Sequence, residues 1–393
     1  MLTENACPVC TSADASVFFE ILDVPIHIGL QWSSQDAARH CPRGDIKLAF
    51  CRVCGVITNL VFEPARLEYK QAYENPLHFS PFFQEYARSV ASRLIKQYNL
   101  HNKDVIEIGC GKGDFLLLLC ELGDNRGVGF DPSYESQPND SDVAGQITFI
   151  RDFYSERYAR YRADLICCRY VLEHIHNSTD FLNMLRRMIG EHSDTVVFFE
   201  VPNVLFILRD LSIWDIIYEH CSYFSAGSLA YIFTLCGFDV YGIDKAYQGQ
   251  YLTIEAVPVK DGAQSSVDSW NSIKEMTSYV THFAGNYRNE LKKWQHKLKR
   301  IERADQRAVV WGAGAKGVSF LNMLKIKDQI EYIVDINPYK QGKYIAGTGQ
   351  QIVAPEFLPD YQPDVVIVMN PIYKTEIQQT VKELGLTTEF IYA

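Results

Sequence analysis

The sequence predicts an α/β protein of several domains. At 393 residues the chain is longer than one ordinary hydrophobic core, so two or three domains are expected. Two segments each show a short apolar strand that runs into a glycine-rich turn and a helix, the unit from which open parallel sheets are built. Two pairs of cysteines mark a separate N-terminal part. We therefore expect a small β module at 1–68, a Rossmann-like domain at 69–262, a helical connector at 263–305 and a second Rossmann-like domain at 306–393.

Composition argues against two classes of partner. The formal net charge of −10 argues against a nucleic acid, because phosphate binding needs clustered lysines and arginines. No apolar run approaches the ~20 residues that span a bilayer, and residues 1–5 lack the basic and apolar regions of a signal peptide. We expect a cytoplasmic protein, a monomer or weak dimer, with neither nucleic acid nor membrane as partner. Its eleven cysteines are then thiols or metal ligands rather than disulfides.

Four of these cysteines form two C-x-x-C pairs, Cys7 with Cys10 and Cys51 with Cys54. Two intervening residues let both thiolates of a pair face one ion, and two pairs complete a tetrahedral zinc shell. Because protein ligands fill all four positions, we predict a structural zinc. The alternatives are unrelated buried cysteines, or replacement of one ligand by Cys41, which lacks a C-x-x-C partner.

The first glycine-rich turn follows the predicted strand 105–108, which carries Glu107. Gly109, Gly111 and Gly113 alternate in a G-x-G-x-G pattern. Glycine accepts positive φ and has no Cβ, so the backbone can turn tightly and a ligand can approach it closely. The spacing departs from the dinucleotide pattern G-x-G-x-x-G.

Three further predicted strands end in residues suited to a nucleoside. Asp131 ends the next strand, where an acidic side chain can accept both ribose hydroxyls. Asp152 and Phe153 follow the third strand, and Arg169 follows the fourth. Four motifs in this order resemble the class I S-adenosylmethionine (SAM) methyltransferases, in which the third strand end contacts the adenine. The resemblance implies a SAM site made of Glu107, Gly109, Gly111, Gly113, Asp131, Asp152, Phe153 and Arg169.

Candidate catalytic groups lie on both sides of this core. Glu219 and His220 are adjacent, ahead of Ser225, which has the pattern of a helix N-cap. Histidine suits general-base work near neutral pH, and a neighbouring carboxylate can orient it. The alternative is that both side chains only hydrogen-bond their own loop. The loop before a predicted helix at Ser80 can cover the pocket, and its candidates for substrate contact are Tyr73, His78 and Ser80.

The cysteine pairs, the SAM core, the segment 219–225 and the second glycine-rich domain together resemble the NDP-sugar C-methyltransferases, which modify 4-keto-deoxysugars. The resemblance covers nearly the whole chain. It implies that a Glu/His site removes the proton beside the substrate's ketone, and that the resulting enolate attacks the methyl group of SAM. By motif position these roles fall on Glu219 and His220, with Tyr218, Tyr73 and His174 in support.

Two departures from the family concern the acceptor. The family reads Tyr-His-Glu-His where this chain has Ile217-Tyr218-Glu219-His220, and a His-Gly-Gly-Ser-x-Arg motif is represented only by residues 248–253. Methylation of a sugar hydroxyl, or of another small metabolite, therefore stays open with the same His220 as base. Which of Glu219 and His220 accepts the proton is also left open.

The second glycine-rich turn reads Gly312-x-Gly314-x-x-Gly317, with Asp335 at the end of the next predicted strand. Taken alone, this pattern fits an NAD(P)-dependent enzyme. In the family that the chain resembles, this turn helps to hold the acceptor. Acceptor binding is favoured over a structural remnant and over a dinucleotide site. The lysines that could cradle a diphosphate at this helix start are Lys316, Lys340 and Lys343.

Overall fold

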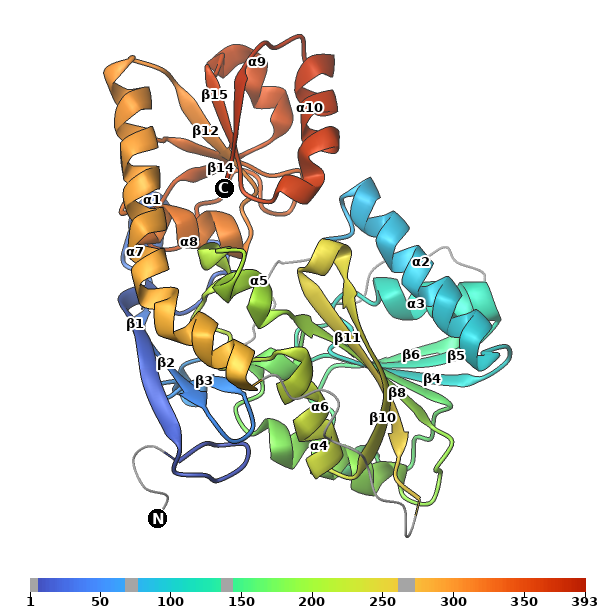
Figure 1. The fold of residues 1–393 in the computed structure, drawn as a ribbon. Helices are drawn as coiled ribbons and strands as arrows, with labels where there is room; N and C mark the ends of the chain where they lie inside the picture. The colour runs from blue at the N-terminus through green and yellow to red at the C-terminus, as the bar shows by residue number, and fades with distance from the viewer. Residues whose placement is uncertain (1–5, 68–76, 136–143, 261–272) are drawn as a thin grey trace.

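A computed structural model describes residues 6–67, 77–135, 144–260 and 273–393. Within these residues the strands form three sheets, of four, seven and five strands (Figure 1). The predicted fold class is confirmed: the central and C-terminal parts are α/β, and the N-terminal part is a small β module. The predicted domain boundaries near 68 and 262 lie outside the described residues, so the domain limits stay a prediction.

The central sheet has the strand order β10-β11-β8-β7-β4-β5-β6. Its strands are β4 (Asp104–Ile108), β5 (Arg126–Phe130), β6 (Ile147–Ile150), β7 (Leu165–Arg169), β8 (Val196–Pro202), β10 (Phe238–Ala246) and β11 (Tyr251–Pro258). Neighbours are parallel except that β11 runs antiparallel to both β8 and β10. The strand order reverses between β4 and β7, and a crevice at the carboxyl ends of such strands is where ligands bind in open α/β sheets.

Helices cover both faces of this sheet (Figure 1). They are α2 (Pro81–Tyr98) and α3 (Asp114–Gly123) on one face, and α4 (Ser178–Ile189) and α6 (Ala226–Leu235) on the other. Every residue of β7 is buried, as expected for a parallel strand covered on both faces. Ser80 and Ser225 cap α2 and α6 by accepting backbone N–H groups, and both helix starts are therefore confirmed.

The N-terminal sheet has the order β1-β2-β3-β9. Its strands are β1 (Ala15–Pro25), β2 (Arg43–Cys51), β3 (Ile57–Asn59) and β9 (Ser222–Tyr223), and the short helix α1 (Gln35–Arg39) lies between β1 and β2. The edge strand β9 comes from the central part of the chain and pairs antiparallel with β3. The residues that follow Glu219 and His220 are thus part of the N-terminal sheet.

The C-terminal sheet is parallel throughout, with the order β14-β13-β12-β15-β16. Its strands are β12 (Ala308–Trp311), β13 (Tyr332–Val334), β14 (Gln351–Val353), β15 (Val365–Val368) and β16 (Glu389–Tyr392), and its helices are α8 (Ala315–Met323), α9 (Leu358–Tyr361) and α10 (Lys374–Glu383). The long helix α7 (Ile273–Arg303) runs from the N-terminal sheet to this domain (Figure 1).

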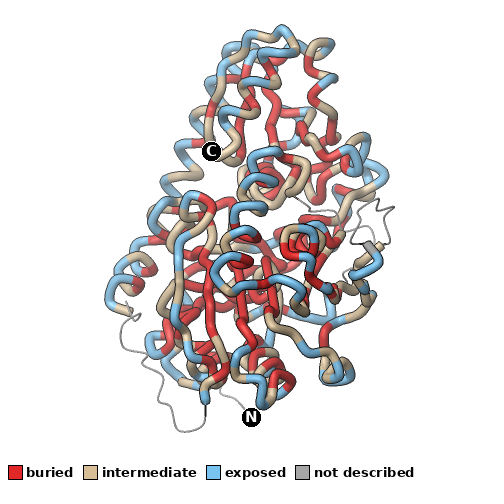
Figure 2. Tube along the Cα trace, turned by 90° about the vertical axis from the view of Figure 1, so that its right-hand side faces the viewer, coloured by how far each residue is buried: buried red, intermediate tan, exposed pale blue. Residues whose placement is uncertain are grey.

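A shared hydrophobic core joins these parts. It runs through the N-terminal sheet, the short helix α5 (Val204–Leu208), α7 and the C-terminal sheet, and buried residues thread through the whole trace in Figure 2. At its centre the rings of Trp214 and Trp294 each lie edge-on to Phe320, with centroids 4.9 Å apart. Such packing fixes the C-terminal domain against the other parts. Within the described residues, no helix combines the length and apolar character needed to span a membrane.

We expect Gly317→Ala to destabilise the C-terminal domain. A Cβ at Gly317 would lie 2.0 Å from the carbonyl oxygen of Gly312, a backbone atom that cannot move without opening the turn after β12. The free energy of unfolding should fall by about 1–3 kcal/mol in urea denaturation. The control is Gly285→Ala in α7, where a Cβ meets nothing within 4 Å, so stability should rise by roughly 0.5–1 kcal/mol. Equal stability of the two variants would contradict the packing described.

Candidate active site

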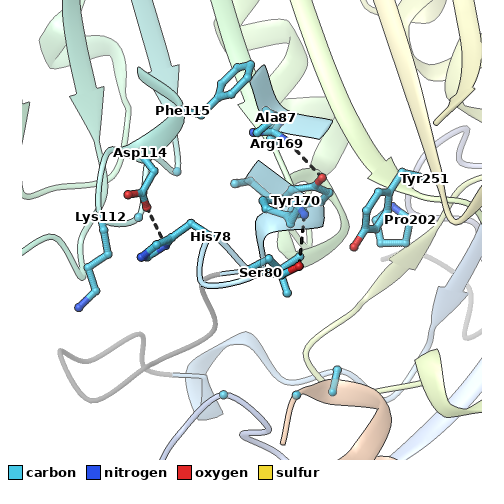
Figure 3. Close-up of a pocket in the computed structure, with 18 of the residues that line it drawn as sticks. His78, Ser80, Ala87, Lys112, Asp114, Phe115, Arg169, Tyr170, Pro202 and Tyr251 are labelled. Carbon is cyan, nitrogen blue, oxygen red and sulfur yellow. Dashed lines mark hydrogen bonds and ion pairs between the residues drawn. The ribbon is translucent and has the colours of Figure 1, made fainter. Parts of the chain in front are cut away.

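A cleft of about 1380 Å³ lies between the carboxyl edge of the central sheet and the C-terminal domain (Figure 3). The turn 109–112 and the segment 78–81 line it from the central part. The segment 312–317 and residues of α10 line it from the C-terminal domain. The cleft therefore lies at the strand-order reversal of the central sheet, with a second domain as its opposite wall.

The glycine turn at this edge has the conformation that its sequence predicts. Gly109, Gly111 and Gly113 have φ values of +71°, +53° and +91°. A Cβ at Gly109 would come within 2.2 Å of Val171, and one at Gly113 within 2.5 Å of the Phe149 ring. Nothing lies within 4 Å of a Cβ built at Gly111. Two glycines are therefore required by packing, and the third leaves open space beside the backbone, where a ligand can approach.

Asp131, at the end of β5, is held beside this turn. Its Oδ2 accepts the Gly111 N–H at 2.9 Å, and its Oδ1 accepts from the backbone N–H and hydroxyl of Ser133 at 2.8 and 2.6 Å. These hydrogen bonds fix the carboxylate at the cleft, where a ribose would need it. The ribose contact itself stays a prediction.

Asp152 and Phe153 line the cleft after β6. The Tyr158 hydroxyl donates to Asp152 at 2.5 Å and lowers the pKa of this carboxyl. Phe153 is 63% exposed. An exposed ring at this edge offers a stacking surface for a flat base, so the predicted adenine contact has a suitable position, although it stays a prediction.

A buried ion pair fixes Arg169 at the end of β7. Its Nε donates to Glu200 Oε2 at 2.7 Å, and Tyr86 donates to the other oxygen of Glu200. The guanidinium carbon lies 4.0 Å from the centroid of the Phe115 ring. Glu107 faces the same cleft, and burial raises its pKa to about 8. Glu200 and Tyr86 were not predicted as site residues.

Tyr170 adopts a strained backbone conformation beside this pair, with φ at +59°. Its N–H donates to the Glu200 carbonyl at 2.8 Å, and its ring lies 4.7 Å from that of Tyr251 (Figure 3). Positive φ is uncommon in a residue with a Cβ, and such strain clusters at functional sites. Here it turns the chain at the end of β7 into the cleft.

The Glu219 carboxylate connects the cleft to the N-terminal module. Its Oε1 accepts the Ile28 N–H at 2.8 Å, and the Gly29 N–H lies 3.5 Å from the same oxygen. The side chain is buried, with Glu219 only 1% exposed. One carboxylate oxygen is therefore engaged with the backbone after β1 rather than with His220.

His220 lies beside His174 in the cleft, with ring centroids 4.9 Å apart and planes at 79°. Burial lowers the pKa of His174 to about 4 and that of His220 well below its ordinary value. The Glu173 carboxyl completes this group, because one ligand atom from each of the three residues lies within 4.8 Å of the others. Burial raises the pKa of Glu173 to about 8. Sequence reasoning missed Glu173, although it directly precedes His174.

The remaining predicted catalytic residues are less well placed. The Tyr218 hydroxyl accepts the Glu63 N–H at 3.1 Å, and its ring fills the space where a Cβ on Gly44 would come within 2.6 Å. Tyr218 is fully buried and is not among the described residues that line the cleft, so its position indicates packing rather than catalysis. Tyr73 lies outside the described residues.

The loop before α2 faces the cleft as expected. His78 Nδ1 lies 3.0 Å from Asp114 Oδ2, and Figure 3 shows the two side chains facing each other beside Lys112. The Ser80 hydroxyl donates to Glu376 of α10 at 2.8 Å. Ser80 thus joins the helix that covers the central sheet to the C-terminal domain.

Further polar contacts cross the cleft. The side-chain amides of Gln250 and Asn370 exchange two hydrogen bonds, of 2.9 and 3.1 Å. The Tyr247 hydroxyl donates to that of Tyr373 at 2.6 Å. Lys316, at the start of α8, forms an ion pair with Asp215 of the central part. The C-terminal domain is therefore held against the central part by polar groups at the cleft itself.

Asp335 is occupied in a way that disfavours a dinucleotide. Its Oδ2 accepts the Ala313 N–H at 2.9 Å and lies 3.3 Å from the Nζ of Lys340, whose side chain is only 5% exposed. Its Oδ1 accepts the Asn337 N–H at 2.9 Å. A carboxylate neutralised by a buried lysine is a poor partner for ribose hydroxyls.

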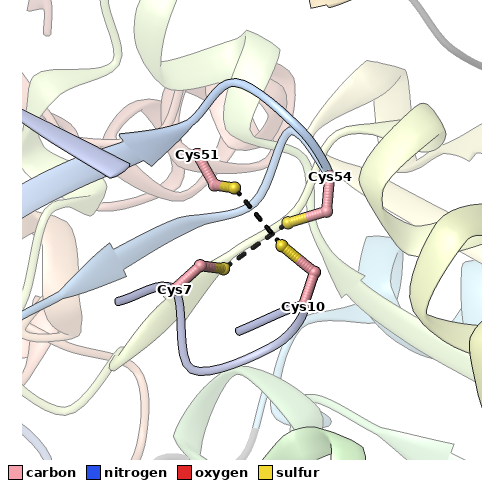
Figure 4. A group of neighbouring side chains, drawn as sticks. All are labelled: Cys7, Cys10, Cys51 and Cys54. Carbon is pink, nitrogen blue, oxygen red and sulfur yellow. Dashed lines mark hydrogen bonds between the residues drawn. The ribbon is translucent and has the colours of Figure 1, made fainter. Parts of the chain in front are cut away.

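The four predicted metal ligands converge in the N-terminal module (Figure 4). Sulfur atoms lie 3.6 Å apart in the pair Cys7–Cys54 and 3.5 Å apart in the pair Cys10–Cys51, and all four lie within 4.8 Å of one another. Zn–S bonds of about 2.3 Å place tetrahedral sulfurs about 3.8 Å apart. The cluster could therefore hold a structural zinc. Cys41 is not part of it.

Substitution of one cluster cysteine should remove the metal. We expect Cys54→Ser to lose bound zinc, measured by mass spectrometry of the purified protein, and to melt at a lower temperature, because a hydroxyl is a poor substitute for a thiolate ligand. The control, Cys41→Ser, changes a buried cysteine outside the cluster and should keep one zinc per chain. Zinc that persists in Cys54→Ser but disappears in Cys41→Ser would contradict this ligand set.

Two protein families and one relative match most of the chain. The family described as "Methyltransferase domain" matches residues 82–242, and that described as "C-methyltransferase C-terminal domain" matches residues 268–393. The C-methyltransferase NovU of Streptomyces niveus is 26% identical over 315 residues, which cover 76% of this chain and 74% of NovU.

Two solved methyltransferase structures are similar to less than half of the chain. The magnesium protoporphyrin IX methyltransferase of Synechocystis PCC 6803 with bound SAH is 18% identical, covers 45% of this chain and 84% of its own, and gives a TM-score of 0.35. The 1,6-didemethyltoxoflavin-N1-methyltransferase of Burkholderia thailandensis is 14% identical, covers 46% and 81%, and gives the same TM-score. With a methyltransferase domain matched at 82–242 and a C-methyltransferase C-terminal domain matched at 268–393, the chain is a SAM-dependent methyltransferase that is similar to the C-methyltransferase NovU.

Proposed function

We propose that the protein C-methylates a nucleotide-linked 4-keto-deoxysugar and that His220 removes the proton beside the ketone. One observation carries the proposal: His220 lines the same cleft as the glycine turn, opposite a C-methyltransferase C-terminal domain. The methyl donor and the base can therefore reach one acceptor from two sides of a single cavity.

The protonation state of His220 suits this role. Because burial holds its pKa well below the ordinary value, the imidazole is neutral at pH 7 and has a lone pair to accept a proton. The proton passes from the carbon beside the ketone to His220, and the C–H electron pair moves onto the ketone oxygen to give an enolate. SAM, when bound, supplies a methyl group on a positively charged sulfur. The cleft would contribute orientation, because holding two reactants in the right geometry lowers the barrier to such a transfer.

His220 is favoured over Glu219 as the base. An oxygen of the Glu219 carboxylate is engaged with the Ile28 N–H, and abstraction of a proton there would compete with that bond. His174 lies against the His220 ring and remains in a supporting position. The role of Glu219 is then to hold the segment that carries His220.

The C-terminal wall offers one lysine to the acceptor. Lys316 lines the cleft at the start of α8, where a helix N-terminus favours anions. Its ion pair with Asp215 would have to yield to a diphosphate. Lys340 is already paired with Asp335, and Lys343 is not among the described residues that line the cleft. The predicted cradle of three lysines is thus reduced to Lys316.

The alternatives make different products. Methylation of a sugar hydroxyl needs the same base but no ring-proton exchange. An NAD(P)-dependent reaction would need Asp335 free for ribose, and Lys340 holds it. Thermal stabilisation by S-adenosylhomocysteine (SAH), with none by NAD(P), separates the methyltransferase from this last class.

Turnover with labelled SAM and a panel of NDP-4-keto-sugars tests the proposal. We expect His220→Ala to slow methyl transfer and deuterium wash-in at the ring carbon by at least about 100-fold, because it removes a general base, while SAH still raises the melting temperature. The control is His176→Ala, an exposed histidine of the same region that does not line the cleft. Full turnover in His220→Ala would refute the role of His220, and methylation of a hydroxyl without exchange would refute the enolate route.

A further inference from the structure

Two buried polar atoms at the proposed general base lack a hydrogen-bond partner: Nδ1 of His220 itself and Oε2 of the neighbouring Glu173. An unsatisfied buried polar atom costs about 1–3 kcal/mol, so such atoms in a native site call for an explanation. Both residues line the cleft, and they belong to the group of three whose ligand atoms lie within 4.8 Å of one another. The two atoms are therefore candidates to satisfy each other.

Backbone contacts hold the segments that carry these two residues against each other. Glu173 lies in the short helix η4 (Leu172–His174), which follows β7 at the carboxyl edge of the sheet. Its carbonyl oxygen accepts the Cys221 N–H at 2.9 Å and the Cys221 thiol at 3.3 Å. The residue directly after His220 is thus fastened to Glu173 itself. This contact keeps the two segments adjacent, so that the carboxyl and the imidazole can lie near one another.

The other acidic groups near His220 are engaged elsewhere. Glu219 Oε1 accepts from Ile28, and Glu200 accepts from both Arg169 and Tyr86. Glu173 is 1% exposed and takes part in no ion pair within the described part of the chain. Among the carboxyl groups of this region, Glu173 is the one whose position suits a bond to the imidazole.

We infer that Glu173 is the positioning residue of His220: it accepts the Nδ1–H of the imidazole and so leaves Nε2 with a lone pair for the acceptor. The inference rests on the proposed function. A carboxylate that holds one imidazole nitrogen fixes the tautomer and stabilises the imidazolium that forms when the proton arrives. Catalytic hydrogen bonds are often long before the substrate binds and shorten afterwards.

The charge state of Glu173 makes the pair sensitive to pH. Burial, followed by the charge of Glu200, raises the pKa of Glu173 to about 8. The carboxyl is therefore protonated below this value, and the carboxylate that can best accept the Nδ1–H forms above it. The titratable groups packed around Glu173 are Cys168, His174, Glu200, His220 and Cys221. Turnover should consequently rise with pH through about 8 and then level off.

The test compares Glu173→Gln with a buried glutamate elsewhere, Glu255→Gln. Glu255 lies on β11, bound to Arg93 and Gln97, and does not line the cleft. Above pH 8, ring-proton exchange in Glu173→Gln should be about 100-fold slower than in the wild type, as expected for an impaired base. KM for the acceptor and stabilisation by SAH should be unchanged, and the rise of the exchange rate with pH should vanish. Glu255→Gln should keep both the rate and the pH profile. Wild-type exchange and an unchanged pH profile in Glu173→Gln would overturn the inference.

Two further measurements distinguish failure of the inferred pairing from failure of the proposed function and from a metal site. Nitrogen-15 NMR of labelled histidine should show the Nδ1–H tautomer of His220 above pH 8 in the wild type and lose that preference in Glu173→Met, whatever the acceptor proves to be. A wild type that exchanges no ring proton but shows this tautomer shift refutes the proposed function alone, and an unchanged tautomer refutes the pairing. If the wild type binds a second zinc per chain and Glu173→Gln loses it, Glu173 belongs to a metal site. This result would overturn the inferred pairing with His220.

Discussion

The hydrogen bond from the Ile28 N–H to the Glu219 carboxylate joins the N-terminal module to the segment that carries His220, the proposed base. The pairing of β9, which follows this segment, with β3 adds a second contact between the same two parts. Close packing of Tyr218 against Gly44 adds a third contact between the same two parts. The N-terminal module therefore supports residues 217–223, and a zinc ion held by its four cysteines would stiffen the sheet that β9 joins.

Burial governs the chemistry of the cleft. It raises the pKa of carboxyl groups such as Glu173 and lowers that of imidazoles such as His220, so both are neutral near pH 7. In the proposed reaction, a neutral imidazole beside a positively charged methyl donor avoids charge repulsion. The buried ion pair of Arg169 and Glu200 joins the carboxyl ends of β7 and β8 at this edge of the sheet.

Features with a local cause were predictable from sequence. The glycine turn and the cysteine pairs follow from backbone geometry and ligand spacing, and the structure has both. The directions of Glu219 and Tyr218 depend on a module that lies 191 and 155 residues away from them in the chain, which spacing does not encode. Glu173 was missed because its importance comes from burial and from the fold that brings Cys221 to its carbonyl. Similarly, the match of Asp335 to a dinucleotide pattern is overruled by a buried lysine.

The most direct test of this account is ring-proton exchange in Glu219→Gln beside Glu219→Ala. A glutamine oxygen can still accept the Ile28 N–H, whereas alanine leaves that donor buried without its acceptor. We predict that Glu219→Gln keeps most of the wild-type exchange rate, and that Glu219→Ala loses it with SAH binding and zinc content intact. An exchange rate in Glu219→Gln as low as that of His220→Ala would make Glu219 the base and contradict its role as the connection between the two parts.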